Sequence, residues 1–421
     1  MEILGQARGF RGGPIRDMIV ESIDFAFEQN SPDTRVLSFL NKYSFAKFDG
    51  KLRVIGFGKA ARGMYLGVKK FFGSRISAAG VILPSLEGEK FDLPFLHGNH
   101  PLPGNESIES SIKLIELLNG ITRNDLVIVL VSGGGSSLFE IMRDGVKLDE
   151  YNETINCMMR NGANISELNA IRYLYSKTKG GGLLDYTYPA KVVSLIISDV
   201  PGDNIETIAS GPTSRPPEKL LIEQTLAKYG KSCTLPEMVE KPSIVTYEAE
   251  NYVILRNSDF VRSIIQKIRD HGIRGIDLGS EIEGDTQSVA KLLVDRMRSE
   301  YRKANDPVIV VGGGETSTKR VGQGKGGRNL ELALRVSLLM ERNEEFTFGS
   351  IGTDGMDGSS NAMGAIVDGE TLKMLDRKFV LESLSKSESL EPLIMSQDVL
   401  FTGFTGTNVS DIFVGYYSGT V

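Results

Sequence analysis

The chain has 421 residues, more than one ordinary hydrophobic core can serve, so we expect two domains. Hydrophobic residues make up 40% of the sequence and charged residues 24%, a balance typical of globular proteins that excludes a disordered or fibrous chain. The 48 basic and 54 acidic residues give a net charge of −6, which excludes a polycationic surface for nucleic acid or an anionic membrane. Any site for an anion must therefore be local.

Cysteine and histidine are scarce in this sequence. Cys157 and Cys233 lie far apart and form no CxxC pair, so we predict buried thiols rather than a disulfide framework or a zinc site. His97 and His100 lie in a loop with Pro and Gly, which favours loop packing or a substrate contact over metal binding. The apolar runs are too short to span a bilayer, and residues 1–13 lack the apolar region of a signal peptide. We expect a cytoplasmic protein.

The first strand–turn–helix pattern places Lys59 near a helix N-terminus. A short strand at 53–55 runs into a glycine-containing turn and a helix over 60–72. The turn matches a relaxed dinucleotide-binding fingerprint, yet Pro-Ser stands after the next strand, where such folds hold the ribose with an acidic residue. Lys59 could meet an anion at this helix N-terminus, or it is simply an exposed lysine that begins a surface helix.

A glycine-rich turn follows the clearest buried strand of the first half, residues 125–131. Its glycines permit positive φ and close approach of a ligand, and its serines add hydrogen-bond donors. The turn predicts a cradle for phosphate or a carboxylate, with a tight structural turn as the alternative. Its residues are Ser132, Gly133, Gly134, Gly135, Ser136 and Ser137.

Asp199 follows another buried strand, residues 191–197, at the strand end where carboxylates of α/β enzymes contact metal or substrate. An Asx-turn is the alternative for this residue. The loop that continues through residues 208–214 has no regular periodicity, and its length favours a functional role over a simple connection.

The composition shifts to Pro-, Glu- and Lys-containing sequence around residues 235–243, so we place the domain boundary between residues 240 and 241. Residues 1–240 and 241–421 each alternate strands and helices, which predicts two α/β domains with largely parallel sheets. An amphipathic helix is expected over residues 14–29, and it could pack on the other domain.

The second domain carries polar residues after two predicted strands. Arg328 begins a helix after two glycines and offers a planar fork for phosphate or carboxylate oxygens. Asp354 follows a strand at 346–351 and could orient an attacking hydroxyl or hold Mg²⁺. An exposed first-turn arginine and an Asp-Gly turn are the alternatives for these two residues. We expect the strand over residues 308–311 to open into a glycine turn. The further predicted substrate- or phosphate-binding residues are Gly312, Gly313, Gly314, Glu315, Thr316 and Asn408.

Several short runs of the sequence, taken in chain order, resemble those of the class II glycerate kinases. The matching runs are residues 56–60 (GFGKA), 131–137 (VSGGGSS), 198–203 (SDVPGD), 210–213 (SGPT), 312–316 (GGGET), 326–329 (GGRN) and 352–358 (GTDGMDG). That family joins an N-terminal Rossmann-like domain to a C-terminal domain called MOFRL, and we expect the active site in the cleft between them. In the turn at residues 403–408, the family pattern has proline where this sequence has Phe404. This change alters the turn without removing its hydrogen-bond donors.

The resemblance implies phosphorylation of D-glycerate, typically to 2-phosphoglycerate, with ATP and Mg²⁺. It makes Lys59, Arg328 and Asp354 the catalytic set. Lys59 and Arg328 would stabilise charge on the transferred phosphoryl group, and Asp354 would activate the substrate hydroxyl or hold the metal. Asp199 would contact metal or substrate. The partners would be small molecules, without nucleic acid or membrane, and a homodimer is left open.

Two other functions fit the same turns. One is an NAD(P)H-dependent hydroxypyruvate reductase or glycerate dehydrogenase, a label that relatives of the family have carried. The other is a non-catalytic nucleotide-binding sensor, which would bind ATP without turnover. The presence of Lys59, Arg328 and Asp354 speaks against a sensor.

Overall fold

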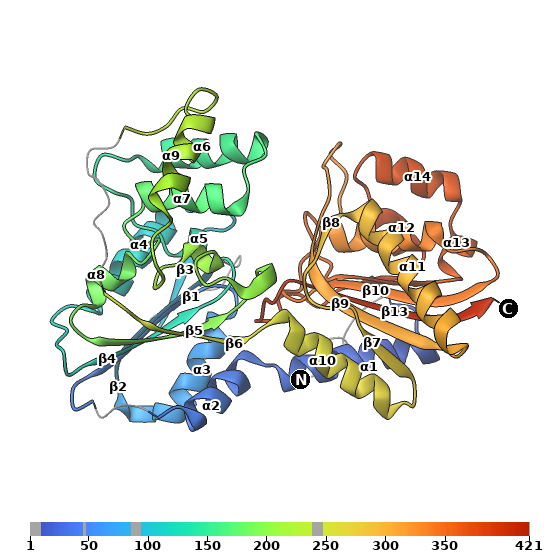
Figure 1. Cartoon of the computed structure of the whole chain (residues 1–421), viewed down its shortest axis with the longest axis horizontal. Helices are drawn as coiled ribbons and strands as arrows, with labels where there is room; N and C mark the ends of the chain where they lie inside the picture. The colour runs from blue at the N-terminus through green and yellow to red at the C-terminus, as the bar shows by residue number, and fades with distance from the viewer. Residues whose placement is uncertain (1–9, 45–47, 86–93, 238–246, 421) are drawn as a thin grey trace. The chain divides into compact units, whose positions relative to one another are not determined.

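The computed structural model describes residues 10–44, 48–85, 94–237 and 247–420, which divide into two compact units. We call residues 32–199 with 203–255 the parallel-sheet unit, and residues 10–31 and 256–420 with 200–202 the mixed-sheet unit (Figure 1). Among the described helices, none is long and apolar enough to cross a membrane.

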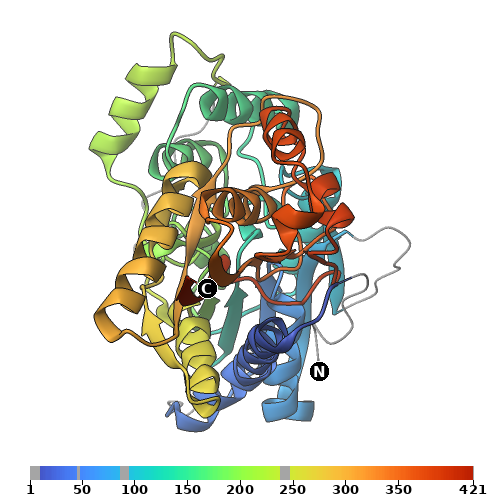
Figure 2. The same cartoon turned by 90° about the vertical axis from the view of Figure 1, so that its right-hand side faces the viewer.

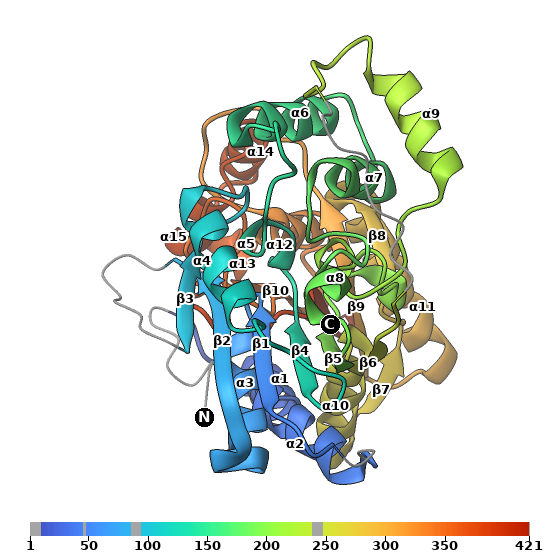
Figure 3. The ribbon, with the colours of Figure 1, turned by 90° about the vertical axis from the view of Figure 1, so that its left-hand side faces the viewer.

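The parallel-sheet unit is built on six described strands whose neighbours all run parallel. Their order is β3-β2-β1-β4-β5-β6, and Figure 3 shows them side by side. This is the order of doubly wound dinucleotide-binding folds, so the prediction of a Rossmann-like first domain is confirmed. Strands β1 and β4 are buried along their whole length, as expected for apolar strands covered on both faces.

The described strands of this unit are β1 (Leu52–Phe57), β2 (Ile76–Pro84), β3 (Phe95–Gly98), β4 (Leu126–Val131), β5 (Lys191–Ile197) and β6 (Glu250–Leu255). Its described helices are α2 (Pro32–Lys42), α3 (Ala61–Phe72), α4 (Asn105–Glu116), α5 (Gly135–Leu138), α6 (Leu148–Arg160), α7 (Ile165–Tyr175), α8 (Leu183–Thr187) and α9 (Lys219–Tyr229).

The units divide between Leu255 and Arg256, later in the chain than the boundary expected from the sequence. Residues 240 and 241 themselves lie outside the described residues. The division falls later because β6 pairs with β5 and so completes the first sheet. In the mixed-sheet unit, α1 (Pro14–Gln29) lies alongside α10 (Asn257–Asp270), as Figure 2 shows.

The sheet of the mixed-sheet unit has the order β12-β11-β10-β13-β9-β7, with β8 also pairing with β9. Among the described strand pairs of this sheet, β7 and β8 each run parallel to β9. The remaining described pairs of the sheet are antiparallel. The prediction of a largely parallel sheet is therefore corrected for this unit. The C-terminal strand, β13 (Asp411–Thr420), inserts between β9 and β10 and runs antiparallel to both.

The described strands of this unit are β7 (Arg274–Asp277), β8 (Ile282–Asp285), β9 (Val308–Ser317), β10 (Glu344–Gly352), β11 (Gly364–Asp368), β12 (Val399–Leu400) and β13 (Asp411–Thr420). Besides α1 and α10, its described helices are α11 (Thr286–Ala304), α12 (Arg328–Leu339), α13 (Thr371–Met374), α14 (Arg377–Ser385) and α15 (Leu390–Met395).

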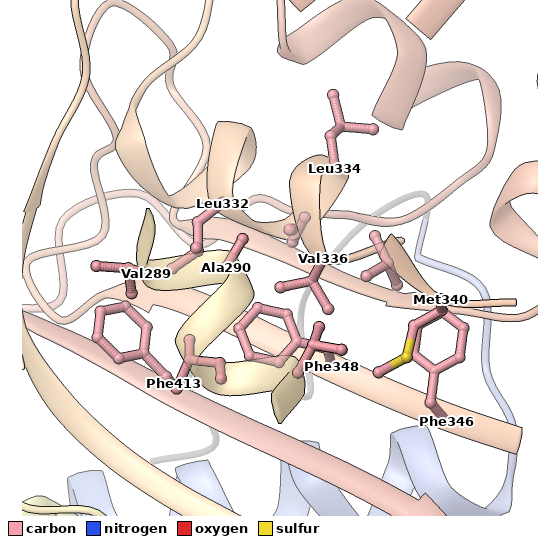
Figure 4. Packing of buried hydrophobic residues seen from close by; sticks show 14 of the residues in the cluster. Val289, Ala290, Leu332, Leu334, Val336, Met340, Phe346, Phe348 and Phe413 are labelled. Carbon is pink, nitrogen blue, oxygen red and sulfur yellow. The ribbon is translucent and has the colours of Figure 1, made fainter. Parts of the chain in front are cut away.

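Helices cover both faces of the mixed sheet. Helices α1 and α10 lie against one face, and α11 and α12 against the other (Figure 1). Figure 4 shows the core on the second face, where buried side chains of two helices meet those of two strands: Val289, Ala290, Leu332, Val336, Phe348 and Phe413. This packing holds α12, which begins at Arg328, against β10, the strand next to β13.

Arg16 anchors α1 to the strands of the mixed sheet. Its Nε donates to Asp368 at 2.6 Å and its Nη2 donates to Asp398 at 2.6 Å, and both Arg16 and Asp398 are almost completely buried. Replacing Arg16 with alanine leaves a buried carboxylate with fewer donors, and breaking a buried pair costs about 3–5 kcal/mol. Because Arg11 also contacts Asp398, we expect the lower end of this range in chemical denaturation. Arg342→Ala, at an exposed position, should change stability by less than about 0.5 kcal/mol. A similar small loss in Arg16→Ala would contradict the anchoring role.

Cys157 and Cys233 form a disulfide, which corrects the prediction of two buried thiols. Their Cα atoms are 5.8 Å apart although the residues are separated by 76 positions in the sequence. The bond joins α6 to the segment after α9. Tyr151 of α6, Tyr229 of α9 and Cys233 belong to one buried cluster, so packing between distant helices brings the two sulfur atoms together.

Candidate functional site

Two of the predicted turns meet at the carboxyl ends of β1 and β4 in the parallel-sheet unit. The chain continues from β1 to β2 on one side and from β4 to β5 on the other, and open α/β sheets bind ligands at such a switch point. The backbone N–H of Lys59 donates to Gly133 O at 2.9 Å, and that of Ala60 donates to Ser132 Oγ at 3.0 Å. The Lys59 turn and the residue 132–137 turn therefore form one structure.

Gly58 permits this close approach of the two turns. Its φ is +123°, and a Cβ built on it would lie 2.2 Å from Ser132 Oγ. Around the second turn, a Cβ on Gly134 would lie 3.5 Å from Lys59 Cγ and 3.4 Å from His100 Nε2. Lys59 and His100 thus flank the backbone of Gly134, and His100 lies beside the predicted anion cradle.

The residue 132–137 turn offers backbone donors to a ligand. Among the described residues, the N–H groups of Gly133, Gly134 and Ser136 donate no hydrogen bond. Amides that donate to no described protein group, in a glycine turn beside a lysine, suit an anion such as phosphate or carboxylate. Ser132 and Ser137 are buried and hold the turn together, since Ser132 Oγ accepts from Ala60 and Ser137 Oγ donates to Gly134 O at 3.2 Å.

The loop predicted to be functional also reaches this turn. Ser210 Oγ lies 2.9 Å from Ser136 Oγ. Ala209 and Ser210 have φ of 51° and 61°, in the left-handed region where residues with side chains are strained, and such strain clusters at functional sites. The sequence marked this loop by its length and by the family run at residues 210–213, without a role for any one residue. Asp199 follows β5 at the same end of the sheet and is partly exposed.

Arg328 is held by two carboxylates in the mixed-sheet unit. Its Nε donates to Asp411 Oδ2 at 2.6 Å, its Nη2 donates to Asp411 Oδ1 at 3.1 Å, and its Nη1 pairs with Glu315. Burial lowers the pKa of Arg328, but the charges of Asp411 and Glu315 outweigh it and raise that pKa above its ordinary value. Asp411 is completely buried and Glu315 is 45% exposed. Asp411 therefore orients the guanidinium, while the Glu315 contact can exchange with a ligand anion.

The N-terminus of α12 is capped by Asp357, a residue that sequence reasoning did not single out. Its carboxylate accepts from the backbone N–H of Asn329 at 3.1 Å and of Leu330 at 2.9 Å. Burial raises the pKa of Asp357 to about 6 against the effect of these two bonds. The Asn329 side chain donates to Asp411 at 3.0 Å and accepts from Ser350 at 2.6 Å. These buried bonds fix the helix start that carries Arg328.

Asp354 lies in a tight turn, where its Oδ1 accepts from Met356 N at 3.1 Å. The preceding Thr353 donates its hydroxyl to Ser410 O at 2.7 Å. Ser410 has a left-handed φ of 70° and directly precedes Asp411, and its N–H donates to Asn408 Oδ1 at 3.2 Å. One short segment, residues 408–411, therefore anchors the neighbour of Asp354 and the carboxylate that orients Arg328. Asn408 is 7% exposed and supports this segment.

Gly312, Gly313 and Gly314 are strand residues, which corrects their prediction as a turn. They continue β9 and pair with Phe413, Ile412 and Asp411 of β13. A Cβ on Gly313 would lie 1.8 Å from Asn257 Oδ1, so glycine allows α10 to approach the strand. Within residues 312–316, Glu315 contacts a residue of the predicted catalytic set, because it pairs with Arg328. Thr316 is buried, with 2% of its surface exposed.

The two residues predicted to hold Mg²⁺, Asp199 and Asp354, lie in different units. Within the part of the chain that the structure describes, no three histidine, cysteine or acidic side chains are grouped to hold a metal ion. The described side chains thus do not form a complete protein site for Mg²⁺. In proteins Mg²⁺ is commonly held by one or two carboxylates together with substrate phosphates.

The sequence matches two family models and is similar to several named proteins. Residues 19–242 match a domain of unknown function, DUF4147, and residues 308–411 match the MOFRL family. A glycerate 2-kinase from Picrophilus torridus is 38% identical, over 96% of each chain. A putative hydroxypyruvate reductase from Agrobacterium vitis is 31% identical, over 86% of each chain.

A solved structure has the same fold over almost the whole chain. The crystal structure of a glycerate kinase from Thermotoga maritima superposes with a TM-score of 0.83 at 30% identity, covering 96% of this chain and 99% of that one. Together with the two family matches, this full-length similarity shows that the chain belongs to the class II glycerate kinase family, the glycerate 2-kinases with a MOFRL domain.

Proposed function

We propose that this chain transfers the γ-phosphoryl group of ATP to D-glycerate and produces 2-phosphoglycerate, with Mg²⁺ as the metal partner of ATP. The observation that carries the proposal is the anchoring of Arg328, whose guanidinium is fixed by a buried carboxylate and begins a capped helix. Phosphoryl transfer depends on positioning and charge stabilisation rather than on covalent chemistry by the protein. A fixed planar cation supplies both.

The proposed reaction uses three groups in separate roles. The 2-hydroxyl of glycerate attacks the γ-phosphorus, and the bond to the β–γ bridging oxygen breaks as the new P–O bond forms. Asp354 takes the proton of the attacking hydroxyl. Arg328 and Lys59 stabilise the negative charge on the transferred group, and the backbone amides of Gly133 and Gly134 bind an anionic group of a substrate. Magnesium would neutralise the charge of the ATP phosphates, and no step here depends on a protein cage for it.

We also propose that the partners are small molecules and that the enzyme is cytoplasmic, where ATP is available. The disulfide does not contradict this, because intracellular disulfides are well known in some hyperthermophiles. Gel filtration with light scattering would decide between a monomer and the homodimer left open by the sequence.

A hydroxypyruvate reductase is the second candidate, because one relative bears that name and the strand order is that of dinucleotide-binding folds. The sequence after β2 weighs against it, since Pro84 and Ser85 stand where such folds place an acidic residue for the ribose. Ser85 instead contacts Gly98 and Glu106.

A coupled assay separates these functions. We expect ADP release that requires glycerate, and no oxidation of NADH or NADPH with hydroxypyruvate. Asp354→Asn should lower kcat by about 10²–10⁴-fold, because an amide cannot accept the hydroxyl proton. Asp306→Asn, at an exposed position of the same unit, should leave kcat unchanged. Oxidation of the reduced nicotinamide without ADP release would refute the kinase, and ATP binding without turnover would indicate a sensor.

A further inference from the structure

A chain of hydrogen bonds ends on Ser136 and determines what its hydroxyl can offer to a ligand. Arg172 Nη1 donates to Asn169 Oδ1 at 3.0 Å, and Ser210 Oγ donates to the same oxygen at 2.8 Å. Ser210 Oγ in turn lies 2.9 Å from Ser136 Oγ. The chain therefore runs from a cation through a carboxamide and a hydroxyl to the residue 132–137 turn.

The bond from Arg172 to Asn169 fixes the direction of the other bonds in the chain. A guanidinium only donates, so the carboxamide oxygen of Asn169 faces Arg172, and its nitrogen faces Thr207 O at 3.4 Å. This oxygen only accepts, so Ser210 uses its single proton on it. The bond between the two serines must then use the proton of Ser136. Ser136 Oγ consequently presents lone pairs, and no proton, to anything that approaches it.

The geometry of this chain is rigid. Asn169 is 5% exposed and Ser210 is 2% exposed. The backbone of Ser210 is held at both groups, since its N–H donates to Thr207 O at 3.1 Å and its C=O accepts from Gly180 at 3.0 Å. Its left-handed φ, with those of Ala209 and Gly211, keeps the hydroxyl turned toward Ser136. Reversing the bond between the two serines would take the Ser210 proton away from the buried Asn169 oxygen and lose that hydrogen bond, leaving only the one from Arg172.

We propose that Ser136 Oγ accepts a hydrogen bond from the 3-hydroxyl of D-glycerate and selects for a substrate that has this group. The proposal rests on the proposed function and assigns one of its substrate contacts. A phosphate oxygen of ATP carries no proton at the pH of a normal assay. It could not donate to Ser136 Oγ, and the lone pairs of the two oxygens would repel each other. The 2-hydroxyl gives its proton to the base as it attacks. Among the groups of glycerate, the 3-hydroxyl is the remaining donor, and the amides of Gly133 and Gly134 in the same turn suit the carboxylate.

Ser136→Ala tests the contact when glycerate is compared with D-lactate, which lacks the 3-hydroxyl. We expect the variant to raise KM for glycerate about tenfold, the effect of one lost hydrogen bond, and to change KM for ATP less than about twofold. The inhibition constant of D-lactate against glycerate should be the same in the variant and the wild type. Ser74→Ala, an exposed serine of the same unit, should match the wild type in all three constants.

Variants of Asn169, a positioning residue, test the direction of the chain. Asn169→Asp keeps an acceptor for Ser210 and should keep KM for glycerate within about threefold. Asn169→Ala removes that acceptor, releases the Ser210 proton and lets Ser136 donate, so KM for glycerate should rise severalfold with KM for ATP unchanged. If Asn169 only supported the fold, Asn169→Ala would lower thermal stability and would raise the KM values for both glycerate and ATP. Asn169→Asp would then not restore them.

Three results would overturn the inference. In an active wild type, Ser136→Ala could leave KM for glycerate unchanged, raise KM for ATP instead, or weaken D-lactate as much as glycerate. Each would show that Ser136 does not accept from the 3-hydroxyl. A wild type that releases no ADP with glycerate would instead refute the proposed function, and the inference with it. Circular dichroism of Ser136→Ala confirms that the measured protein is folded, and the Asn169 pair gives a second test.

Discussion

Replacing Arg328 with lysine should lower kcat for glycerate phosphorylation about a thousandfold while the protein stays folded. The guanidinium reaches both oxygens of Asp411 and still has Nη1 directed to the Glu315 side, where a phosphate oxygen can replace the carboxylate. A lysine ammonium is a point charge that cannot bridge both partners in fixed geometry. Loss of one charge-stabilising group typically costs 10²–10³-fold, and an arginine on a transferring phosphoryl group 10³-fold or more.

Two further variants separate orientation from charge. Asp411→Asn keeps the shape of the residue but weakens the charge-assisted pair, so kcat should fall less than in Arg328→Lys, with little change in KM. Arg342→Lys, an exposed arginine in the same unit, should behave as wild type. Steady-state kinetics at saturating ATP and glycerate give these values. A kcat of Arg328→Lys within tenfold of the wild type would show that bidentate geometry at this position is not needed.

Replacing Cys157 and Cys233 together with serine should lower the free energy of unfolding by about 4 kcal/mol. The disulfide closes a loop with a sequence separation of 76 residues, and the chain-entropy model assigns between 4 and 5 kcal/mol to roughly that length, at the upper end of the range seen in proteins. The effect arises mainly because the cross-link restricts the unfolded chain. Chemical denaturation with and without a thiol reductant measures it.

The double serine variant is also the control for reduction. A reductant should destabilise the wild type to the level of the variant and should leave the variant unchanged. Thiol titration of the unfolded, unreduced wild type should find no free cysteine. Two titratable thiols there, or equal stability of the two proteins, would contradict the disulfide.

The parallel-sheet unit could be predicted because its signals are local. The apolar run of β4 is continuous, that of β5 is interrupted only by Ser194, a helix follows most strands, and β–α–β units build a parallel sheet. The turns after β1 and β4 were recognisable from their glycines, and they meet because β1 and β4 are neighbouring parallel strands. For the same reason α1 was predicted with its observed bounds.

Other features depend on contacts between distant residues and could not be predicted from local patterns. The pairing of β13 with β9 and β10 turned a predicted turn at Gly312 into strand and made the sheet mixed. The disulfide requires the packing of α6 and α9. Asp411, which lies 83 positions from Arg328, gave no local sign that it would orient the guanidinium.

In the candidate site too, some features could be predicted from local sequence and others depend on contacts between distant residues. The residue types of the 132–137 turn predicted donors for an anion, and the backbone of this turn offers them. The direction of the Ser136 hydroxyl depends on Arg172, Asn169 and Ser210, which come from α7 and the loop after β5. Only their meeting in three dimensions determines whether this serine donates or accepts.

Phosphorus NMR of the product formed by the wild-type chain from ATP, Mg²⁺ and D-glycerate shows which hydroxyl has been phosphorylated. We expect a phosphate ester coupled to a single proton, a doublet, because phosphorus is bonded through oxygen to the CH group of 2-phosphoglycerate. A triplet would identify the CH₂ ester, 3-phosphoglycerate, and contradict the assignment of the attacking hydroxyl. No ester signal under these conditions would contradict glycerate phosphorylation itself.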